Sequence, residues 1–290
     1  MRHKQHRRIG SVIWYVAATL ISVVTVFPLL WTLLTSLRPE SEILTSGFDF
    51  LPKTWTLQNY MTAFQQVPFG RYLLNSLIIG AGGTILNLLL GSMAGYAFAR
   101  LSFRFREHLF WVLISAMMVP GVLTMIPCFL VLHGLPLLGG NDILGHGGVG
   151  LINTLWAVVL PGAAGPFAMF MMRQQFGAID PAFAEAARLD GASELRIFGQ
   201  VYLPLVKPGL AVLAILTFQA GWNNFLWPLV VLRTQDKMPI QVGLAVFRKQ
   251  YETSYGPLMA GTLIACIPVI LIFVVFQRWI IEGQASAGVK

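Results

Sequence analysis

The distribution of charged residues limits how this chain can fold more than any other feature. Only 11% of the 290 residues are Asp, Glu, Lys or Arg, and six long runs contain none of them. An α-helix needs about 20 apolar residues to cross the hydrocarbon core of a bilayer, and each run is long enough. The sequence therefore predicts an all-α integral membrane protein with six transmembrane helices, near residues 11–36, 72–98, 109–132, 150–172, 208–231 and 258–280.

The basic residues indicate which side of the membrane each connecting segment faces. With six spans both termini share a side, and 12 of the 20 Lys and Arg residues lie in the segments of that side, which are 1–10, 99–108, 173–207 and 281–290. Basic residues concentrate in short cytoplasmic segments. We expect a transmembrane domain at 11–280, cytoplasmic ends at 1–10 and 281–290, and outer loops at 38–70, 133–149 and 233–257. This sorting explains the net charge of +8 without nucleic-acid binding.

The segment between the fourth and fifth spans, residues 177–207, predicts a compact helical hairpin. Asp180 is a suitable N-cap, and Pro181 can occupy the first helical position because its missing N–H is not needed there. We expect a helix over 182–190, ended by Gly191 in the left-handed conformation that glycine adopts freely. A second helix would start at Ser193 and place on its apolar side Leu195, Ile197, Phe198 and Val201.

The composition of the first helix favours docking over catalysis. Its alanines give the helix a narrow cross-section, and charged side chains lie beside them at Glu185, Arg188 and Asp190. Such a shape could fit a groove on another protein. The alternative is a solvated connector whose glycine and prolines only stop helices.

The hairpin residues resemble the EAA motif of bacterial ABC importer permeases. The matching residues are Glu185, Ala186, Ala187, Asp190, Gly191, Ala192, Leu203 and Pro204. Outside the hairpin, the chain is similar to the carbohydrate branch typified by the maltose and glycerol phosphate permeases, in Asn75-Ser76, in residues 95–100 (GYAFAR), in residues 222–228 (WNNFLWP) and at the C-terminus. It departs from that pattern in a longer Gly-rich stretch at 139–150 and in ending Ala-Gly-Val-Lys rather than Gly-Ala-Val-Lys.

The resemblance implies a type I ABC importer permease fold and a non-enzymatic role. In that family two homologous permease subunits form the pathway, two cytoplasmic ATPase subunits bind ATP and Mg²⁺, and an extracytoplasmic sugar-binding protein delivers the substrate. This chain would be one permease in the bacterial inner membrane and would bind no cofactor itself. Its hairpin would dock on an ATPase subunit, with Glu185 as an ion-pair partner and Gly191 setting the hairpin angle, and would couple ATP hydrolysis to alternating access.

Missing motifs agree with this division of labour. The sequence has no G-x-x-x-x-G-K-[ST] phosphate loop, so the energy source would lie in another chain. It has no metal-ligand motif, and Cys128 and Cys266 lie within predicted spans, where a thiol usually acts as a small hydrophobe. It also places no charged residue deep in a span, which argues against ion coupling. A permease for another solute class, or a secondary transporter or membrane enzyme, remain as alternatives.

Amide side chains inside two spans are candidates to line the substrate pathway. The fifth span holds Gln219, Trp222, Asn223 and Asn224, and amides beside an aromatic ring suit hydroxyl-rich ligands. The second holds Asn87 in a stripe of small residues with Gly83, Gly91 and Gly95, which also favours close helix packing. The alternative for all of them is hydrogen bonding between helices.

The third outer loop is the segment with which this family contacts its binding protein. The candidate residues in this loop are Lys237, Arg248, Lys249, Tyr251 and Tyr255. A solvated loop without a partner is the alternative.

Overall fold

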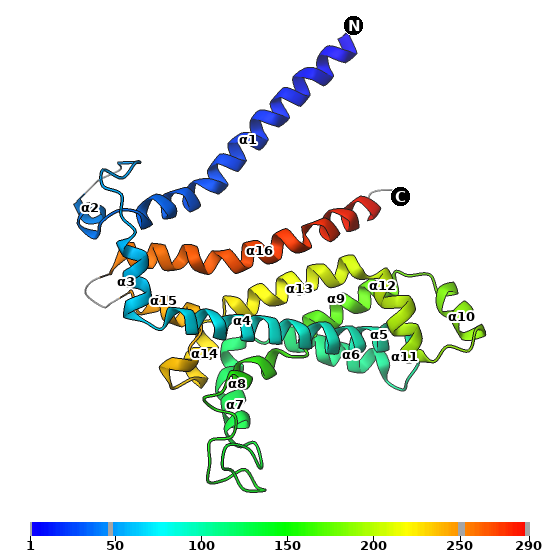
Figure 1. Ribbon diagram of the computed structural model, residues 1–290. Coiled ribbons are helices and arrows are strands. Elements are labelled where there is room, and N and C mark those ends of the chain that lie inside the picture. The colour runs from blue at the N-terminus through cyan, green and yellow to red at the C-terminus, as the bar shows by residue number, and fades with distance from the viewer. Residues whose placement is uncertain (1, 46–48, 249–252, 288–290) are drawn as a thin grey trace. The chain divides into compact units, whose positions relative to one another are not determined.

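The computed structural model describes residues 2–45, 49–248 and 253–287. Helices dominate these ranges, and Arg248 and Thr253 form an isolated antiparallel bridge (Figure 1). The chain divides into two compact units, Met1–Phe69 with Leu244–Ile267, and Gly70–Gly243 with Pro268–Lys290.

All six predicted spans correspond to helical segments, but only three are continuous helices. The segments long and apolar enough to cross a membrane are Ile13–Ser36, Phe69–Arg100 and Tyr255–Trp279. Three helix pairs also pass this test when each is taken together: Arg106–Met118 with Gly121–His133, bent by 107°, Leu155–Gly162 with Pro166–Gly177, bent by 42°, and Glu194–Leu205 with Lys207–Trp222, bent by 82°. The described residues therefore contain three spans, or up to six if each bent pair is one.

Three predicted spans are interrupted in the structure, and the one over 150–172 is divided at residues 163–165. The prediction over 109–132 is divided into α6 (Arg106–Ser115) with a short 3-10 turn, and α7 (Gly121–His133). Val119 precedes Pro120 and takes an extended conformation, ψ 119°, because a proline ring disfavours the helical conformation in the residue before it. The prediction over 208–231 is divided into α13 (Lys207–Trp222) and α14 (Leu226–Val231).

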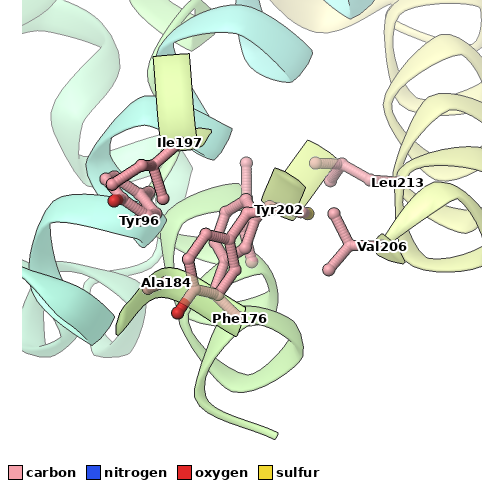
Figure 2. Packing of buried hydrophobic residues seen from close by; sticks show 9 residues of the cluster. Tyr96, Phe176, Ala184, Ile197, Tyr202, Val206 and Leu213 are labelled. Carbon is pink, nitrogen blue, oxygen red and sulfur yellow. The ribbon is translucent and has the colours of Figure 1, made fainter. Parts of the chain in front are cut away.

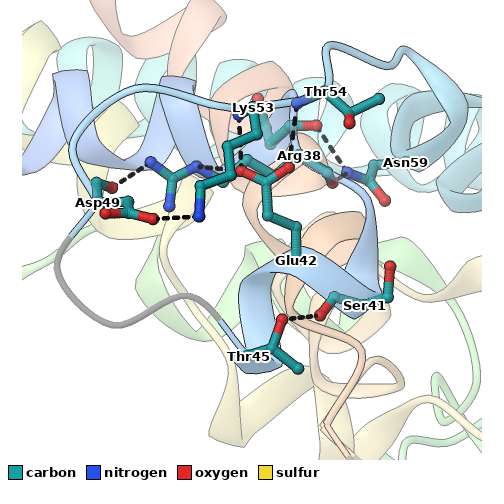
Figure 3. A network of polar contacts seen from close by, with 9 residues as sticks. Arg38, Ser41, Glu42, Thr45, Asp49, Lys53, Thr54 and Asn59 are labelled. Atoms are coloured by element: carbon teal, nitrogen blue, oxygen red, sulfur yellow. Dashed lines mark hydrogen bonds and ion pairs between the residues drawn. The ribbon is translucent and has the colours of Figure 1, made fainter.

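The first unit holds an outer segment between two long helices. It contains α1 (Arg2–Ser36), α2 (Glu40–Thr45), α3 (Gln58–Gln66) and the beginning of α16 (Tyr255–Ala287). A polar network joins Arg38, Glu42, Asp49, Lys53 and Asn59 (Figure 3).

The second unit is built around close packing of α5 (Ser92–Arg100) against α9 (Pro166–Gly177). α5 continues α4 (Phe69–Leu86) through a π-helical turn, Asn87–Gly91. A Cβ atom at Gly91 would lie 2.6 Å from the Cβ of Ala168, and one at Gly95 2.6 Å from the Cβ of Met172. These distances are too short for any side chain, so the stripe of small residues serves helix packing.

An aromatic cluster lies at the end of this packed pair. Tyr96, Phe176, Ala184, Ile197, Tyr202, Val206 and Leu213 are buried together (Figure 2). They come from α5, α9, the hairpin and α13, so one core joins the hairpin to the apolar helices. Burial of aromatic side chains contributes most of the packing energy of such a cluster.

The remaining loops of the second unit lie at the other end of the α4–α5 helix. The Gly-rich connection after α7 is irregular as expected, with positive φ at Gly139, Gly140, Gly145, Gly147 and Gly150. It leads to α8 (Leu155–Val159). After α14, a 3-10 turn (Gln235–Lys237) precedes α15 (Ile240–Ala245). The Asn75 amide donates to the carbonyls of Asp236 and Met238, at 2.8 and 3.0 Å, and so fixes this segment to α4.

Candidate functional site

The first arm of the hairpin forms as its sequence predicts. α10 spans Ala182–Leu189, and the Asp180 carboxylate accepts the Ala182 N–H at 2.9 Å. At the other end Gly191 has φ +79°, its N–H donates to the Arg188 carbonyl at 3.0 Å, and the Ala192 N–H donates to the Ala187 carbonyl at 3.0 Å. This pair of bonds is a Schellman motif, which satisfies the last carbonyls of a helix and reverses the chain.

The second arm begins at the expected residue but differs in detail. Ser193 is the N-cap of α11 (Glu194–Arg196), although its side chain makes no capping hydrogen bond. A π-helical stretch (Ile197–Tyr202) and α12 (Leu203–Leu205) follow. Ile197 is fully buried, whereas Leu195 is 74% exposed, so the expectation that Leu195 lies on the apolar side is wrong. α11 is only one turn long and continues as a π-helical stretch, so the periodicity of an α-helix did not predict which side Leu195 faces.

The motif residues lie largely on the outward surface of the hairpin. Glu185, Ala186, Asp190, Gly191 and Pro204 are exposed, and Ala187, Ala192 and Leu203 are half-buried. Three large apolar side chains are also exposed there: Phe183 at 52%, Leu189 at 90% and Leu195 at 74%. Exposed apolar residues gathered on a projecting element commonly mark a protein interaction site.

Charged side chains link the two arms of the hairpin to each other and the hairpin to α5. Arg188 Nε donates to Glu194 Oε1 at 2.9 Å, which raises the pKa of Arg188, and the Tyr96 hydroxyl donates to Glu194 Oε2 at 2.7 Å. Arg100 Nη2, at the end of α5, donates to the Phe176 carbonyl at 2.6 Å and also to the carbonyl of Ile179. These contacts could not be predicted from the residues alone, because Tyr96 and Glu194 are far apart in the chain.

A cavity of about 450 Å³ lies within the second unit. Its lining includes Gly83, Asn87, Phe167, Thr217, Gly221 and Asn224. The Asn87 amide donates to the carbonyls of Gly83 and Gly162, at 3.0 and 2.6 Å, and its carbonyl accepts the Gly165 N–H at 3.2 Å. Asn87 thus forms hydrogen bonds with Gly162 and Gly165, where the chain bends between α8 and α9. Its side chain also borders the cavity.

The other pathway candidates occupy different places. Trp222 is 1% exposed and its ring stacks on Phe218 at 5.6 Å, so in this conformation it belongs to the core. Gln219 and Asn223 are exposed, and the Asn223 carbonyl accepts a hydrogen bond from Gln241 at 3.1 Å. Of the five candidates, the structure brings together only Asn87 and Asn224 at the cavity.

The binding-protein candidates fall in two different units. Lys237 belongs to the second unit, where its ammonium donates to the Asn153 carbonyl at 2.8 Å. Arg248 and Tyr255 belong to the first unit and are both exposed, Tyr255 at 43%. Lys249 and Tyr251 lie outside the described residues.

Long apolar helices, a hairpin with exposed apolar side chains and a cavity between helices are features expected of a membrane transport protein. Residues 87–284 match the family described as the binding-protein-dependent transport system inner membrane component. The chain belongs to this family, and is therefore a multi-pass inner-membrane permease subunit of such a system.

Individual relatives agree with the family. The chain is 36% identical over 273 residues to the arabinooligosaccharides transport system permease protein AraQ of Halalkalibacterium halodurans, covering 93% of each. It is 36% identical over 269 residues to the diacetylchitobiose uptake system permease protein NgcG of Streptomyces coelicolor, covering 92% of this chain and 84% of that protein. A crystal structure of a bacterial ABC transporter that imports alginate is similar over 93% of this chain and 96% of its own, with a TM-score of 0.77 and 25% identity.

Proposed function

We propose that this chain is one of two permease subunits of an ATP-driven sugar importer and that the hairpin is where ATP-driven motion enters it. The observation that carries this proposal is the hairpin's outward surface, where Leu189 is 90% exposed beside the exposed Glu185 and Gly191. An apolar side chain left in water on a rigid, well-capped element stabilises a complex when a partner covers it.

The protein that binds to this surface of the hairpin is a cytoplasmic ATPase subunit. The hairpin is short and braced, so a push at Leu189 moves it as one body. Glu185 supplies a carboxylate for an arginine or lysine of the ATPase, and Gly191 fixes the angle between the two arms. ATP and Mg²⁺ bind to the two ATPase subunits, and this chain contributes no cofactor and no catalytic residue.

The cavity supplies a candidate stretch of the sugar pathway. Its volume of about 450 Å³ falls in the range of small-ligand sites. The Asn224 amide can donate to or accept from a hydroxyl group, and Asn87 Oδ1, which accepts the Gly165 N–H, can accept one more hydrogen bond. Gln219 and Asn223, both exposed here, would face either the pathway or the second permease subunit. A homologous second permease would complete the channel.

A carbohydrate is the substrate class that the relatives favour. The matched proteins are named for arabinooligosaccharide and diacetylchitobiose transport, and the similar crystal structure is of an alginate importer. In this scheme an extracytoplasmic binding protein delivers the sugar to the outer loops, with Lys237, Arg248 and Tyr255 among its contacts, and both termini lie in the cytoplasm.

The test is transport by the assembled complex. The chain, its partner permease and the ATPase are reconstituted in proteoliposomes with the cognate binding protein, whose ligand is first identified by screening sugars, peptides and phosphonates. We expect sugar uptake only when ATP and the binding protein are both present, and no ATP hydrolysis by this chain alone. Uptake without ATP, or a peptide or phosphonate as the ligand, would refute the proposal.

A further inference from the structure

One carboxylate joins the hairpin to a membrane helix. Glu194, the first residue of the second arm, binds Arg188 of the first arm through Oε1 and the hydroxyl of Tyr96 on α5 through Oε2, at 2.9 and 2.7 Å. Glu194 thus holds together both arms of the hairpin and α5, and α5 is connected to the hairpin along the backbone only through a long stretch of chain.

The surroundings of this hydrogen bond make it strong. Tyr96 is 4% exposed, and its ring lies 5.7 Å from Phe176, 5.2 Å from Phe198 and 5.3 Å from Tyr202. A hydrogen bond to a charged acceptor at the edge of an apolar cluster is worth more than one in water, and its loss costs correspondingly more. The phenol points out of the cluster toward the hairpin and meets the only carboxylate that hydrogen bonds to it among the described residues.

Apolar contacts alone would not link the motion of α5 to that of the hairpin. The hairpin leads into α13 through the 82° bend at Val206, and it follows α9 through a turn at Ala178–Pro181. α5 has no such covalent connection to the hairpin. Its contacts with the hairpin are the aromatic cluster, whose faces can slide, and the Arg100 guanidinium, which donates to the Ile179 carbonyl before the first arm and lies over the Tyr202 ring. The bond between Tyr96 and Glu194 is the hydrogen bond that ties α5 to the second arm, and it cannot slide without breaking.

We propose that Tyr96 and Glu194 are positioning residues that make α5 move with the hairpin, so that a push from the ATPase changes the shape of the pathway. The inference rests on the proposed function, since it assumes that the ATPase docks on the hairpin. α5 continues through the π-helical turn into the segment that carries Asn87, so its displacement reaches the cavity directly.

The same cluster provides a matched control. Tyr202 is fully buried beside Tyr96, yet its hydroxyl makes no hydrogen bond to any described residue. Tyr96→Phe and Tyr202→Phe therefore remove the same atom from neighbouring rings in one cluster. Only the first breaks a link between the hairpin and α5.

The experiment compares sugar uptake with ATP hydrolysis in proteoliposomes of the complete transporter. We expect Tyr96→Phe to lower the sugar transported per ATP hydrolysed by about tenfold, the effect of losing one charge-assisted hydrogen bond, while Tyr202→Phe keeps the wild-type ratio. Glu194→Gln retains an acceptor for Tyr96 but loses the ion pair with Arg188, so a smaller fall of about threefold is expected. Amide exchange should quicken at residues 182–196 in Tyr96→Phe and stay unchanged at residues 166–177.

The outcomes separate this inference from the proposed function. Absence of ATP-dependent uptake by the wild-type complex would count against the proposed function itself. A wild-type ratio in Tyr96→Phe, or equal falls in both phenylalanine variants, would overturn the role of the hydroxyl while leaving the transporter assignment intact. Should Tyr96→Phe fail to assemble, Glu194→Gln decides: a lowered ratio supports the link, and a wild-type ratio overturns it.

Discussion

The hairpin and the outer segment of the first unit, residues 37–66, are both short helical connections, but different forces hold them. In the outer segment, buried polar side chains bind the backbone: Arg38 is 3% exposed, and Asn59 is 5% exposed and donates to two carbonyls. In the hairpin the shape comes from a backbone motif centred on Gly191 and from an apolar inner face. The hairpin therefore keeps its outer side chains available for another protein, whereas the outer segment depends on its own side chains for its shape.

The largest expected effect comes from the hairpin's backbone. Gly191→Val should reduce ATP-dependent uptake at least about tenfold, because a β-branched residue is strained at φ +79°. Nothing beyond the adjacent residues lies within 4 Å of a Cβ placed at this position, so the expected effect comes from backbone strain rather than from crowding at the Cβ by another part of the chain. Gly191→Asn is the matched variant, since asparagine tolerates this conformation, and should transport within about twofold of wild type. Equal transport by the valine and asparagine variants would contradict the role of the glycine.

In the outer segment a side-chain deletion should matter most. Asn59→Ala leaves the carbonyls of Ser36 and Arg38 without their donor, at a cost of about 2 kcal/mol in the free energy of opening this segment. Amide hydrogen exchange over residues 37–66 measures that free energy. The neighbouring Gln58 is exposed, and Gln58→Ala should leave exchange unchanged. Equal protection in the two variants would show that the polar network does not hold the segment.

The packing beneath the hairpin should show an effect of about 1–2 kcal/mol. Gly95→Ala places a methyl group 2.6 Å from the Cβ of Met172 and forces α5 away from α9, which should lower thermal stability. Gly83→Ala lies on the same face with nothing within 4 Å, and the better helix propensity of alanine should leave stability equal or higher. Thermal unfolding followed by tryptophan fluorescence compares the two, and a Gly95→Ala protein as stable as Gly83→Ala would contradict the close packing.

The smallest expected effect is a pH dependence of amide exchange in the outer segment, residues 37–66. The Glu42 carboxylate accepts the N–H groups of Lys53 and Thr54, at 2.8 and 3.1 Å, and the Lys53 bond is the main reason that its pKa lies below the ordinary value of 4.5 (Figure 3). Its contribution to stability is therefore complete above pH 4.5 and disappears as the pH falls through the lowered value. Exchange at the Lys53 and Thr54 amides should speed up over that range beyond its intrinsic pH dependence. Glu42→Gln should remove this extra dependence, and its persistence in that variant would assign it to another group.

Features that depend on local rules were predictable from the sequence. Long charge-free runs located the apolar helices that are able to cross a membrane. Asp180, Pro181 and Gly191 predicted the first arm, because caps and left-handed turns are set by neighbouring residues. Pro120 carried a signal for the bend within 109–132, since it makes Val119 extended.

Features that depend on tertiary contacts were not predictable. The outward direction of Leu195, the burial of Trp222 and the bond between Tyr96 and Glu194 all depend on which elements meet in space. A one-turn helix such as α11 has too few residues for a periodic pattern, and an amide or aromatic residue in an apolar run can face a neighbouring helix or a cavity. The cavity itself joins residues from three separate stretches of the chain, which include Gly83, Gly165 and Asn224.

The affinity of the purified permease for its ATPase subunit, with and without a charge at the hairpin's tip, tests the central claim most directly. Leu189 is 90% exposed and has no role in the hairpin's own packing, so Leu189→Asp should fold normally. We predict that it weakens ATPase binding at least about tenfold, because the apolar contact is replaced by a desolvated carboxylate, whereas Leu44→Asp, at a 64% exposed leucine of the first unit, leaves binding unchanged. Wild-type affinity in Leu189→Asp would contradict the claim that the ATPase docks on this surface.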